Sequence, residues 1–448
     1  GQYSLEIIIA KLTTLSMIDL DKWLLPVLAS IYLPLTAGAV LKQLFKSVRW
    51  SQLLIISSLL LPVTWFIFTT PQSLAYFWLL LIVMFGLIAK RSADFIILYL
   101  LAVASLVAQP IAGIPALLLV LALHLMSSTW RWRQQSFSIL LFFQAVSLPA
   151  IFWYLNNTQA VANPINDPAV FSRLSNQYTI SLPNLHSLWL NFIQLLQTNY
   201  WLLLIMLIYA GAYLIWQQKI KQPYLTYVLM AGAGLVAYGL SKILPFDFLI
   251  NYDRNYYTQR LLFTSLIFLL PFIWQTLAWL WRRIMNTQIS LRWPWLIVIA
   301  LLITGSAYLR YPRWDDYVKT RGPATSAVDL TAVQWIDADA NGQDYIVLAN
   351  QQVGAAALRE LGFKAYYQQQ FYYSIPTGAP LYQYYLNMVY GPSLAEIEAV
   401  RQLTSVNLVY FVVNSYWEPY EKIVADTYNL ADDSQNINNQ LMIFRFDK

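Results

Sequence analysis

The chain has no cysteine and few charged residues. Of its 448 residues, only 11% are Asp, Glu, Lys or Arg, whereas 58% are hydrophobic. The absence of cysteine excludes disulfide bonds, thiolate zinc sites and a cysteine nucleophile. The only two histidines, His124 and His186, lie in separate segments, so a histidine metal cluster is excluded as well. Soluble domains carry about 25% charged residues, and the deficit therefore indicates that lipid is the main solvent of this chain.

Long apolar segments fill most of the chain up to residue 310. A bilayer core about 30 Å thick requires roughly 20 apolar residues for each spanning helix. We predict ten spans, at residues 24–44, 51–69, 73–89, 93–109, 111–127, 137–155, 200–217, 224–244, 261–281 and 293–309. The expected fold class is a polytopic α-helical membrane protein with a juxtamembrane segment at 1–23, a transmembrane domain at 24–309 and a water-soluble α/β domain at 310–448.

Basic residues cluster in every second gap between the predicted spans. The clusters comprise Lys42, Lys46, Arg49, Lys90, Arg91, Arg131, Arg133, Lys219, Lys221, Arg282, Arg283 and Arg292. By the positive-inside rule these gaps face the cytoplasm, and both termini and the 310–448 domain are then extracytoplasmic. We expect a multi-pass protein of the cell (plasma or inner) membrane. Cytoplasmic retention accounts for the basic residues, so no nucleic-acid partner is predicted.

The N-terminal segment poses a topological problem. Residues 1–23 would start outside the cytoplasm, although no signal peptide or span delivers them there. We therefore expect a further helix and loop upstream of Gly1 in the natural protein. The stretch 5–18 is apolar but short and contains Glu6 and Lys11, which is typical of an interfacial helix.

Two predicted outer loops, at 156–199 and 245–260, are longer than the others. The second reads PFDFLINYDRNYYTQR and contains Asp253, Arg254 and Arg260. Charges that directly precede a span are costly unless they face a cavity, a lipid headgroup or a partner. The alternative is an Asp253–Arg254 surface pair with Arg260 extending to the headgroups. Lys242 lies near the outer end of its span and can reach the same region, although extension of its amine to the lipid headgroups is the simpler account.

The C-terminal domain shows alternating strand and helix patterns. Strands are expected at 345–349, 408–413 and 441–446, and helices at 353–361, 393–403 and 419–428. This alternation predicts a largely parallel sheet. Asn350, Gln351 and Gln352 follow the first strand, where such folds bind ligands. No glycine-rich nucleotide motif is present. The aromatic run at 366–373 suits a core or membrane-facing surface better than sugar stacking.

The order of these parts resembles the GT-C superfamily of polyprenyl-phosphate-dependent membrane glycosyltransferases, which includes oligosaccharyltransferases and protein mannosyltransferases. The resemblance covers most of the chain in architecture. Three segments carry it: YSLEIIIAKLTTLSMIDLDKWLLPVLASIYLPL looks like the region after the first outer loop, and TTPQSLAYFWLLL and AQPIAGIPALLLVLAL look like recurring family segments. The motifs are loose. The principal catalytic acid of the family sits in the first outer loop, and this chain resembles a member without the first helix and that loop. Glu6 is the nearest remaining carboxylate.

The resemblance implies transfer of a sugar from a polyprenyl-phosphate or pyrophosphate carrier to a sugar, lipid or protein acceptor at the outer membrane face. The site residues that it implies are Asp253 as a catalytic carboxylate and Arg254 and Arg260 as ligands of the lipid phosphate. Asn350 and Gln351 would contact the acceptor. It also leaves room for a divalent metal, Mg or Mn, although the sequence assigns no metal ligand.

Two other functions remain open. A non-catalytic membrane subunit would present its extracytoplasmic domain to partners, and loss of the catalytic loop favours it. A transporter is disfavoured because we find no internal repeat with matched broken helices between residues 1–155 and 200–309.

The topology makes a direct prediction. A cysteine introduced into residues 310–448 of this cysteine-free chain, for example Gln343→Cys, should react with a membrane-impermeant maleimide without access to the cytosol. Mass spectrometry of the labelled protein measures the extent of reaction. Labelling only after the cytosol is made accessible would contradict the topology.

Overall fold

The computed structural model describes residues 2–15, 17–44, 66, 70–158, 188, 191, 195, 199–219, 223–244, 251–286, 288–310, 325–375, 379–415 and 420–447. The chain divides into two compact units, Gly1–Tyr311 and Pro312–Lys448. Each unit is considered by itself.

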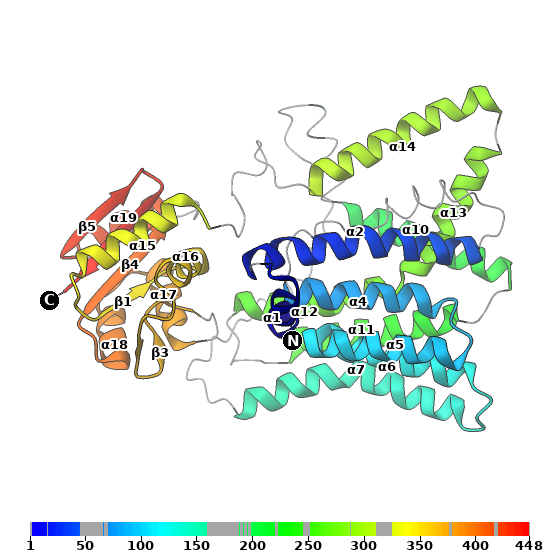
Figure 1. The fold of residues 1–448 in the computed structure, drawn as a ribbon, viewed down its shortest axis with the longest axis horizontal. Helices are drawn as coiled ribbons and strands as arrows, with labels where there is room; N and C mark the ends of the chain where they lie inside the picture. The colour runs from blue at the N-terminus through cyan, green and yellow to red at the C-terminus, as the bar shows by residue number, and fades with distance from the viewer. Residues whose placement is uncertain are drawn as a thin grey trace. The chain divides into compact units, whose positions relative to one another are not determined.

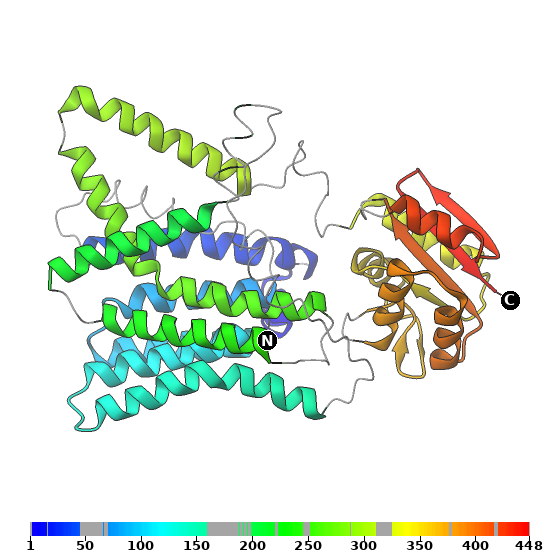
Figure 2. The same ribbon diagram turned by 180° about the vertical axis from the view of Figure 1, so that it is seen from behind.

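The first unit is helical (Figures 1 and 2). Its described helices are α1 (Gln2–Thr13), α2 (Met17–Leu44), α4 (Pro71–Gly86), α5 (Ser92–Ala108), α6 (Pro110–Ser127), α7 (Arg133–Thr158), α10 (Tyr200–Gln217), α11 (Tyr224–Ile243), α12 (Asn251–Phe268), α13 (Leu270–Met285) and α14 (Ile289–Arg310). Neighbouring helices run side by side through most of the bundle, with α5 between α4 and α6 in chain order. This is a helical membrane protein.

Five described helices are long and apolar enough to cross a membrane, and a bent pair makes a sixth candidate. The five lie within α2, α6, α7, α10 and α11. The bounds of α10 coincide with the predicted span at 200–217. Two other predicted spans are the apolar helices α4 and α5, of 16 and 17 residues. The predicted span 51–69 and the predicted loop 156–199 lie largely outside the described residues.

The predicted span at 261–281 is broken into two helices. The chain forms two helices there, α12 and α13, which meet at Leu269 with a bend of 46°. Pro271 explains the break, because it has no N–H to donate to the preceding turn and its ring disfavours a continuous helix. The predicted outer loop 245–260 is partly wrong, since the chain is helical from Asn251 onward.

The N-terminal segment is helical in two pieces. Helix α1 ends at Thr13, Thr14 has a positive φ of 61°, and α2 begins at Met17, earlier than the predicted 24. Ile8 and Leu12 of α1 are exposed, whereas Glu6 is buried. A short helix with exposed apolar side chains agrees with the predicted interfacial character.

Close helix packing in the bundle depends on glycine. A Cβ on Gly113 of α6 would lie 2.1 Å from the Cα of Leu106 in α5, and one on Gly211 of α10 would lie 2.0 Å from the carbonyl oxygen of Phe272 in α13. Small residues let helix backbones approach in membranes, where hydrophobic exclusion gives no drive for association. The Tyr227 hydroxyl, completely buried, adds a hydrogen bond of 2.9 Å to the carbonyl of Val83.

The second unit contains a four-stranded sheet. Its strands are β1 (Tyr345–Leu348), β4 (Leu408–Asn414), β5 (Asp433–Ile437) and β6 (Leu441–Phe446), in the order β1-β4-β6-β5. Only β1 and β4 are parallel, and the other two pairs are antiparallel. The prediction of a largely parallel sheet is therefore wrong. Strand β5, with the sequence DSQNI, was missed because it is mostly polar and contains no apolar run that would indicate a strand.

The described helices of this unit are α15 (Ala327–Asp339), α16 (Gln351–Leu361), α17 (Pro380–Tyr390), α18 (Leu394–Thr404) and α19 (Tyr420–Tyr428); β2 (Tyr366–Tyr367) and β3 (Gln370–Phe371) form a small hairpin. Side chains and glycine end these helices. The Ser393 hydroxyl accepts a hydrogen bond from the amide of Glu396 at the start of α18, and Gly362 ends α16 with φ 66°. Tyr372 and Tyr373 of the aromatic run are buried in the core.

The glycine contacts generate a test of the bundle packing. Gly211→Ala should destabilise the protein by about 1–3 kcal/mol, because the new methyl group meets the backbone of α13. Gly232→Ala in α11 is the matched control, since nothing lies within 4 Å of its Cβ position. Apparent melting temperatures in detergent measure both. Equal stability of the two variants would contradict the packing.

Candidate functional site

Two cationic side chains lie on adjacent helices. Lys242 is in the last turn of α11, and Arg260 is near the middle of α12. A Cβ on Gly234 would lie 2.3 Å from Ser265 Oγ, and Ala237 and Leu261 share one apolar cluster. These two pairs set an antiparallel register, which places Arg260 opposite residues 238–239 of α11, about one helical turn further into the bundle than Lys242.

Each of the two cations lies near an aromatic ring. The Lys242 Nζ is 6.0 Å from the centroid of the Tyr238 ring, and the Arg260 Cζ is 4.7 Å from that of Tyr257. Lys242 is only 8% exposed. The face of an aromatic ring attracts a cation without contributing a formal negative charge. These contacts help to fix the positions of the two side chains.

The backbone of Arg260 ties α12 to the bundle. Its carbonyl accepts a hydrogen bond of 2.9 Å from the Thr264 hydroxyl and a longer one, of 3.5 Å, from the Tyr76 hydroxyl in α4. Thr258 and Thr264 are both 1% exposed. The face of α12 that carries these threonines therefore points into the protein.

Further polar groups line the same helix interface at greater depth. Gln144 of α7 is buried, and its Nε2 lies 3.4 Å from the Cβ position of Gly234 in α11. Among the described residues, Gln144 Oε1, Ser147 Oγ and Ser241 Oγ are buried atoms with no hydrogen-bond partner. Buried polar groups at membrane depth are costly without a partner, which makes them candidates for contact with a polar ligand. The interface of α7, α11 and α12 thus combines these polar groups with the apolar cluster that contains Leu148, Ala237 and Leu261.

The structure places the predicted lipid-phosphate residues on α12. Asp253 and Arg254 lie in the first turns of this helix, and their side chains are outside the described part of the chain. Arg260 follows Asp253 by seven residues, two helical turns. Sequence reasoning named Arg260 and Lys242 but missed Gln144, Ser147 and Ser241. These three residues could have been found in the sequence, because each is a polar residue inside an otherwise apolar span.

The predicted acceptor contact Asn350 has a structural role instead. It is 3% exposed and caps α16, where its Oδ1 accepts a 3.0 Å hydrogen bond from the amide of Val353. Its Nδ2 donates to Asn414 Oδ1, and Asn414 Nδ2 donates to Asp329 Oδ1, at 2.8 and 2.9 Å. The network occupies the carboxyl ends of β1 and β4, where a ligand was expected. Gln351 is exposed at the start of α16.

The titratable groups of the second unit serve as structural partners. Burial alone would raise the pKa of Asp337, but hydrogen bonds from Lys364 and Tyr345 outweigh it and hold this pKa below its ordinary value. Because the folded-state pKa is lowered, Asp337 stabilises the fold near neutral pH, and this contribution is lost as the pH falls through that pKa. Burial raises the pKa of Tyr372 to about 12, so its phenol stays protonated.

No group of three His, Asp or Glu side chains that could hold a metal ion is present in the described parts of the chain. The described residues of α11 and α12 include two cations, which suit an anion and repel a divalent metal. A metal would require carboxylate ligands such as Asp253, and the proposed reaction does not depend on a metal.

Adjacent residues give a clean test of the second unit. Asn350→Ala should destabilise the protein by about 1–2 kcal/mol, because it removes the cap of α16 and a partner of the buried Asn414. Gln351→Ala should change stability by less than about 0.5 kcal/mol, because the side chain is exposed. Denaturant titration followed by circular dichroism measures both. Equal effects would contradict the assigned network.

Comparison with known proteins does not identify a family for this chain. No family model matches the sequence, and no curated protein or solved structure matches it either. The strongest functional feature is the pair of cations on α11 and α12 above a polar helix interface.

Proposed function

We propose that this protein is a membrane glycosyltransferase that binds the phosphate of a polyprenyl-linked sugar donor at Lys242 and Arg260. One observation carries the proposal: two cations lie about one helical turn apart on two packed helices in an apolar bundle. An anionic ligand that approaches from the lipid would be attracted by both cations. The resemblance in the order of the parts supplies the reaction type.

The chemistry of sugar transfer suits this arrangement. When the sugar leaves, negative charge develops on the carrier phosphate, and cations fixed beside it stabilise the transition state. Arg260 offers a planar, bidentate donor to phosphate oxygens, whereas Lys242 acts as a point charge. The deeper polar groups of Gln144 and Ser241 provide hydrogen-bonding partners for a sugar.

The acceptor requires a base or an orienting carboxylate. We assign this role to Asp253, which lies two helical turns before Arg260 on α12. A carboxylate there would accept the proton of the acceptor hydroxyl. A divalent ion, Mg or Mn, held by Asp253 is a compatible alternative within the same proposal.

The basic gaps between the spans give the membrane orientation that the proposal assumes. With the Lys90 and Arg131 gaps on the cytoplasmic side, the opposite end of the bundle, where Lys242 and Arg260 lie, faces the outer leaflet. Residues 310–448 then form an extracytoplasmic domain. Lipid-linked sugars presented at this face would reach the cations laterally.

A non-catalytic, partner-presenting subunit is the second candidate. The second unit exposes large apolar side chains, including Phe363 at 75% and Tyr390 at 81%. Isolated exposed aromatics are common on interfaces that bind other proteins. Asn350, in contrast, forms hydrogen bonds with Val353 and Asn414 within the fold.

The transfer assay tests the proposal. Arg260→Gln and Lys242→Gln should each reduce sugar transfer from a polyprenyl-phosphate donor by tenfold or more, since each removes a charge from the leaving phosphate. Arg254→Ala should also reduce it. Radiolabelled sugar incorporated by purified protein in proteoliposomes gives the rate.

Arg283→Gln is the matched control, because Arg283 is an exposed arginine at the opposite end of the bundle. Its rate should equal that of the unmodified protein. Full activity of Arg260→Gln and Lys242→Gln would overturn the phosphate site. A complete absence of transfer by the unmodified protein, with tight donor binding, would favour the non-catalytic subunit.

A further inference from the structure

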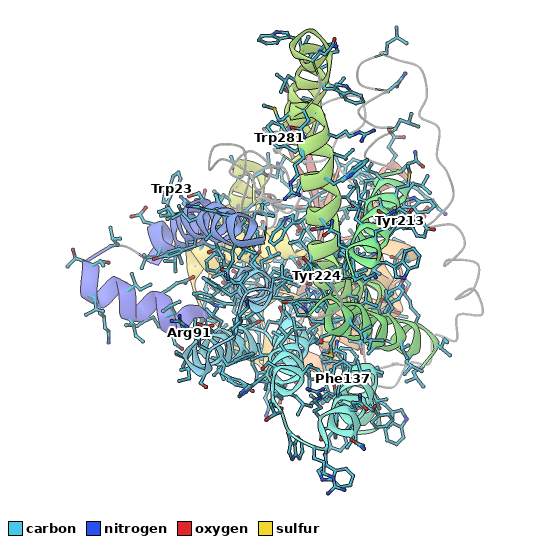
Figure 3. The ribbon with its side chains drawn as sticks, turned by 90° about the vertical axis from the view of Figure 1, so that its right-hand side faces the viewer. Trp23, Arg91, Phe137, Tyr213, Tyr224 and Trp281 are labelled. Carbon is cyan, nitrogen blue, oxygen red and sulfur yellow. The ribbon has the colours of Figure 1, made fainter. Side chains whose placement is uncertain are left out.

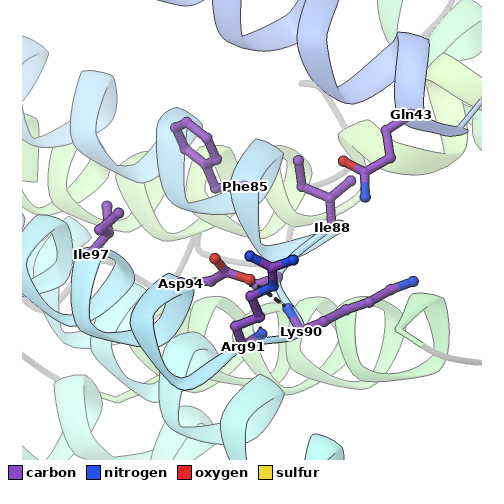
Figure 4. Close-up of a pocket in the computed structure, with 8 residues that line it drawn as sticks. Gln43, Phe85, Ile88, Lys90, Arg91, Asp94 and Ile97 are labelled. Carbon is purple, nitrogen blue, oxygen red and sulfur yellow. Dashed lines mark hydrogen bonds between the residues drawn. The ribbon is translucent and has the colours of Figure 1, made fainter.

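A second cationic site lies at the other end of the bundle. A pocket of about 360 Å³ is lined by Gln43 of α2, the end of α4 at Phe85, Ile88 and Ala89, and the start of α5 at Lys90, Arg91, Asp94 and Ile97 (Figure 4). Figure 3 views this end of the bundle, with Arg91 labelled at its edge. None of these residues belongs to the site at Lys242 and Arg260.

The turn between α4 and α5 is fixed by its own carboxylate. Asp94 Oδ2 accepts hydrogen bonds of 2.9 Å from the backbone amides of both Lys90 and Arg91. The carboxylate is thereby committed to the backbone. The side chains of Lys90 and Arg91 are exposed, and no ion pair to either is found among the described residues. Two cations and one carboxylate leave the pocket with one net positive charge.

Apolar side chains share the pocket with the cations. Phe85 is 36% exposed and Ile97 is 53% exposed. In Figure 4 the Gln43 side chain points from α2 towards Ile88 and Arg91, so an amide faces the cations across the pocket. A free anion would gain nothing from the exposed hydrocarbon, whereas a lipid places its phosphate and its acyl chains in such a mixed setting.

We propose that this pocket binds an anionic glycerophospholipid of the leaflet that faces the basic gaps. The phosphate lies between Arg91, which can donate two parallel hydrogen bonds, and Lys90. The N-terminal end of α5 adds a favourable dipole. The Gln43 amide contacts the glycerol or ester region, and the acyl chains lie along Phe85 and Ile97. The lipid thereby fastens α2 to the α4–α5 turn. This site is independent of the proposed transfer reaction.

Native mass spectrometry of the full chain with added phosphatidylglycerol or phosphatidylcholine tests the site. Phosphatidylglycerol should remain bound in preference to phosphatidylcholine. The double variant Lys90→Gln/Arg91→Gln should lose roughly tenfold or more of this binding, because about two surface cations are removed. Arg131→Gln/Lys219→Gln is the matched control: it removes the same charge from exposed residues outside the pocket and should bind the lipid normally.

Two further arms separate the sources of the phosphate. Excess inorganic phosphate should not displace the lipid, because it lacks the acyl chains that contact Phe85 and Ile97; displacement would show an ion site and overturn the lipid assignment. Lys90→Arg/Arg91→Lys keeps both charges and should retain most of the binding. Equal loss in the pocket variant and the control variant, or equal binding of the two lipids, would also overturn the proposal.

Discussion

The cost of burying a polar group in an apolar solvent governs this structure. Most buried side chains of α4, α5 and α6 are apolar, and glycines bring helix backbones together. Polar residues are nevertheless buried at several places in the unit, among them Ser105 of α5, Gln144 of α7 and Ser241 and Lys242 of α11. Such groups are costly in lipid unless they have polar partners, and the proposed donor phosphate would be one further partner for Lys242.

Most helices of the first unit can be predicted from the sequence, because each spanning helix requires an apolar run of sufficient length, whatever its neighbours are. The bounds of α10 follow directly from its apolar run. The break between α12 and α13 was missed, although Pro271 was visible, since proline kinks some spanning helices and breaks others according to packing. The helical start at Asn251 was missed because its first turns are polar and lack the apolar pattern used to find spans.

The second unit shows a different limit. The strands at β1, β4 and β6 were found from short apolar runs, but strand direction depends on contacts between distant segments, and the β4–β6 pairing is antiparallel. Local sequence also placed Asn350 at a ligand-binding turn. Whether such a residue binds a ligand or another part of the protein depends on the tertiary contacts around it. In this fold, Asn350 donates a hydrogen bond to Asn414, which in turn donates one to Asp329. Arg260 and Lys242 were identifiable because a charge in or near a span is informative on its own. Their proximity on neighbouring helices required the register of α11 against α12.

The most direct test of the phosphate site is photocrosslinking with a polyprenyl-phosphate analogue that carries a diazirine next to its phosphate. After irradiation in proteoliposomes, peptide mapping locates the adducts. The account predicts adducts concentrated in the last turns of α11 and the first turns of α12, around Lys242 and Tyr257. Adducts confined to outward-facing positions such as Leu100 and Val107 of α5 would show ordinary lipid contact and contradict the account.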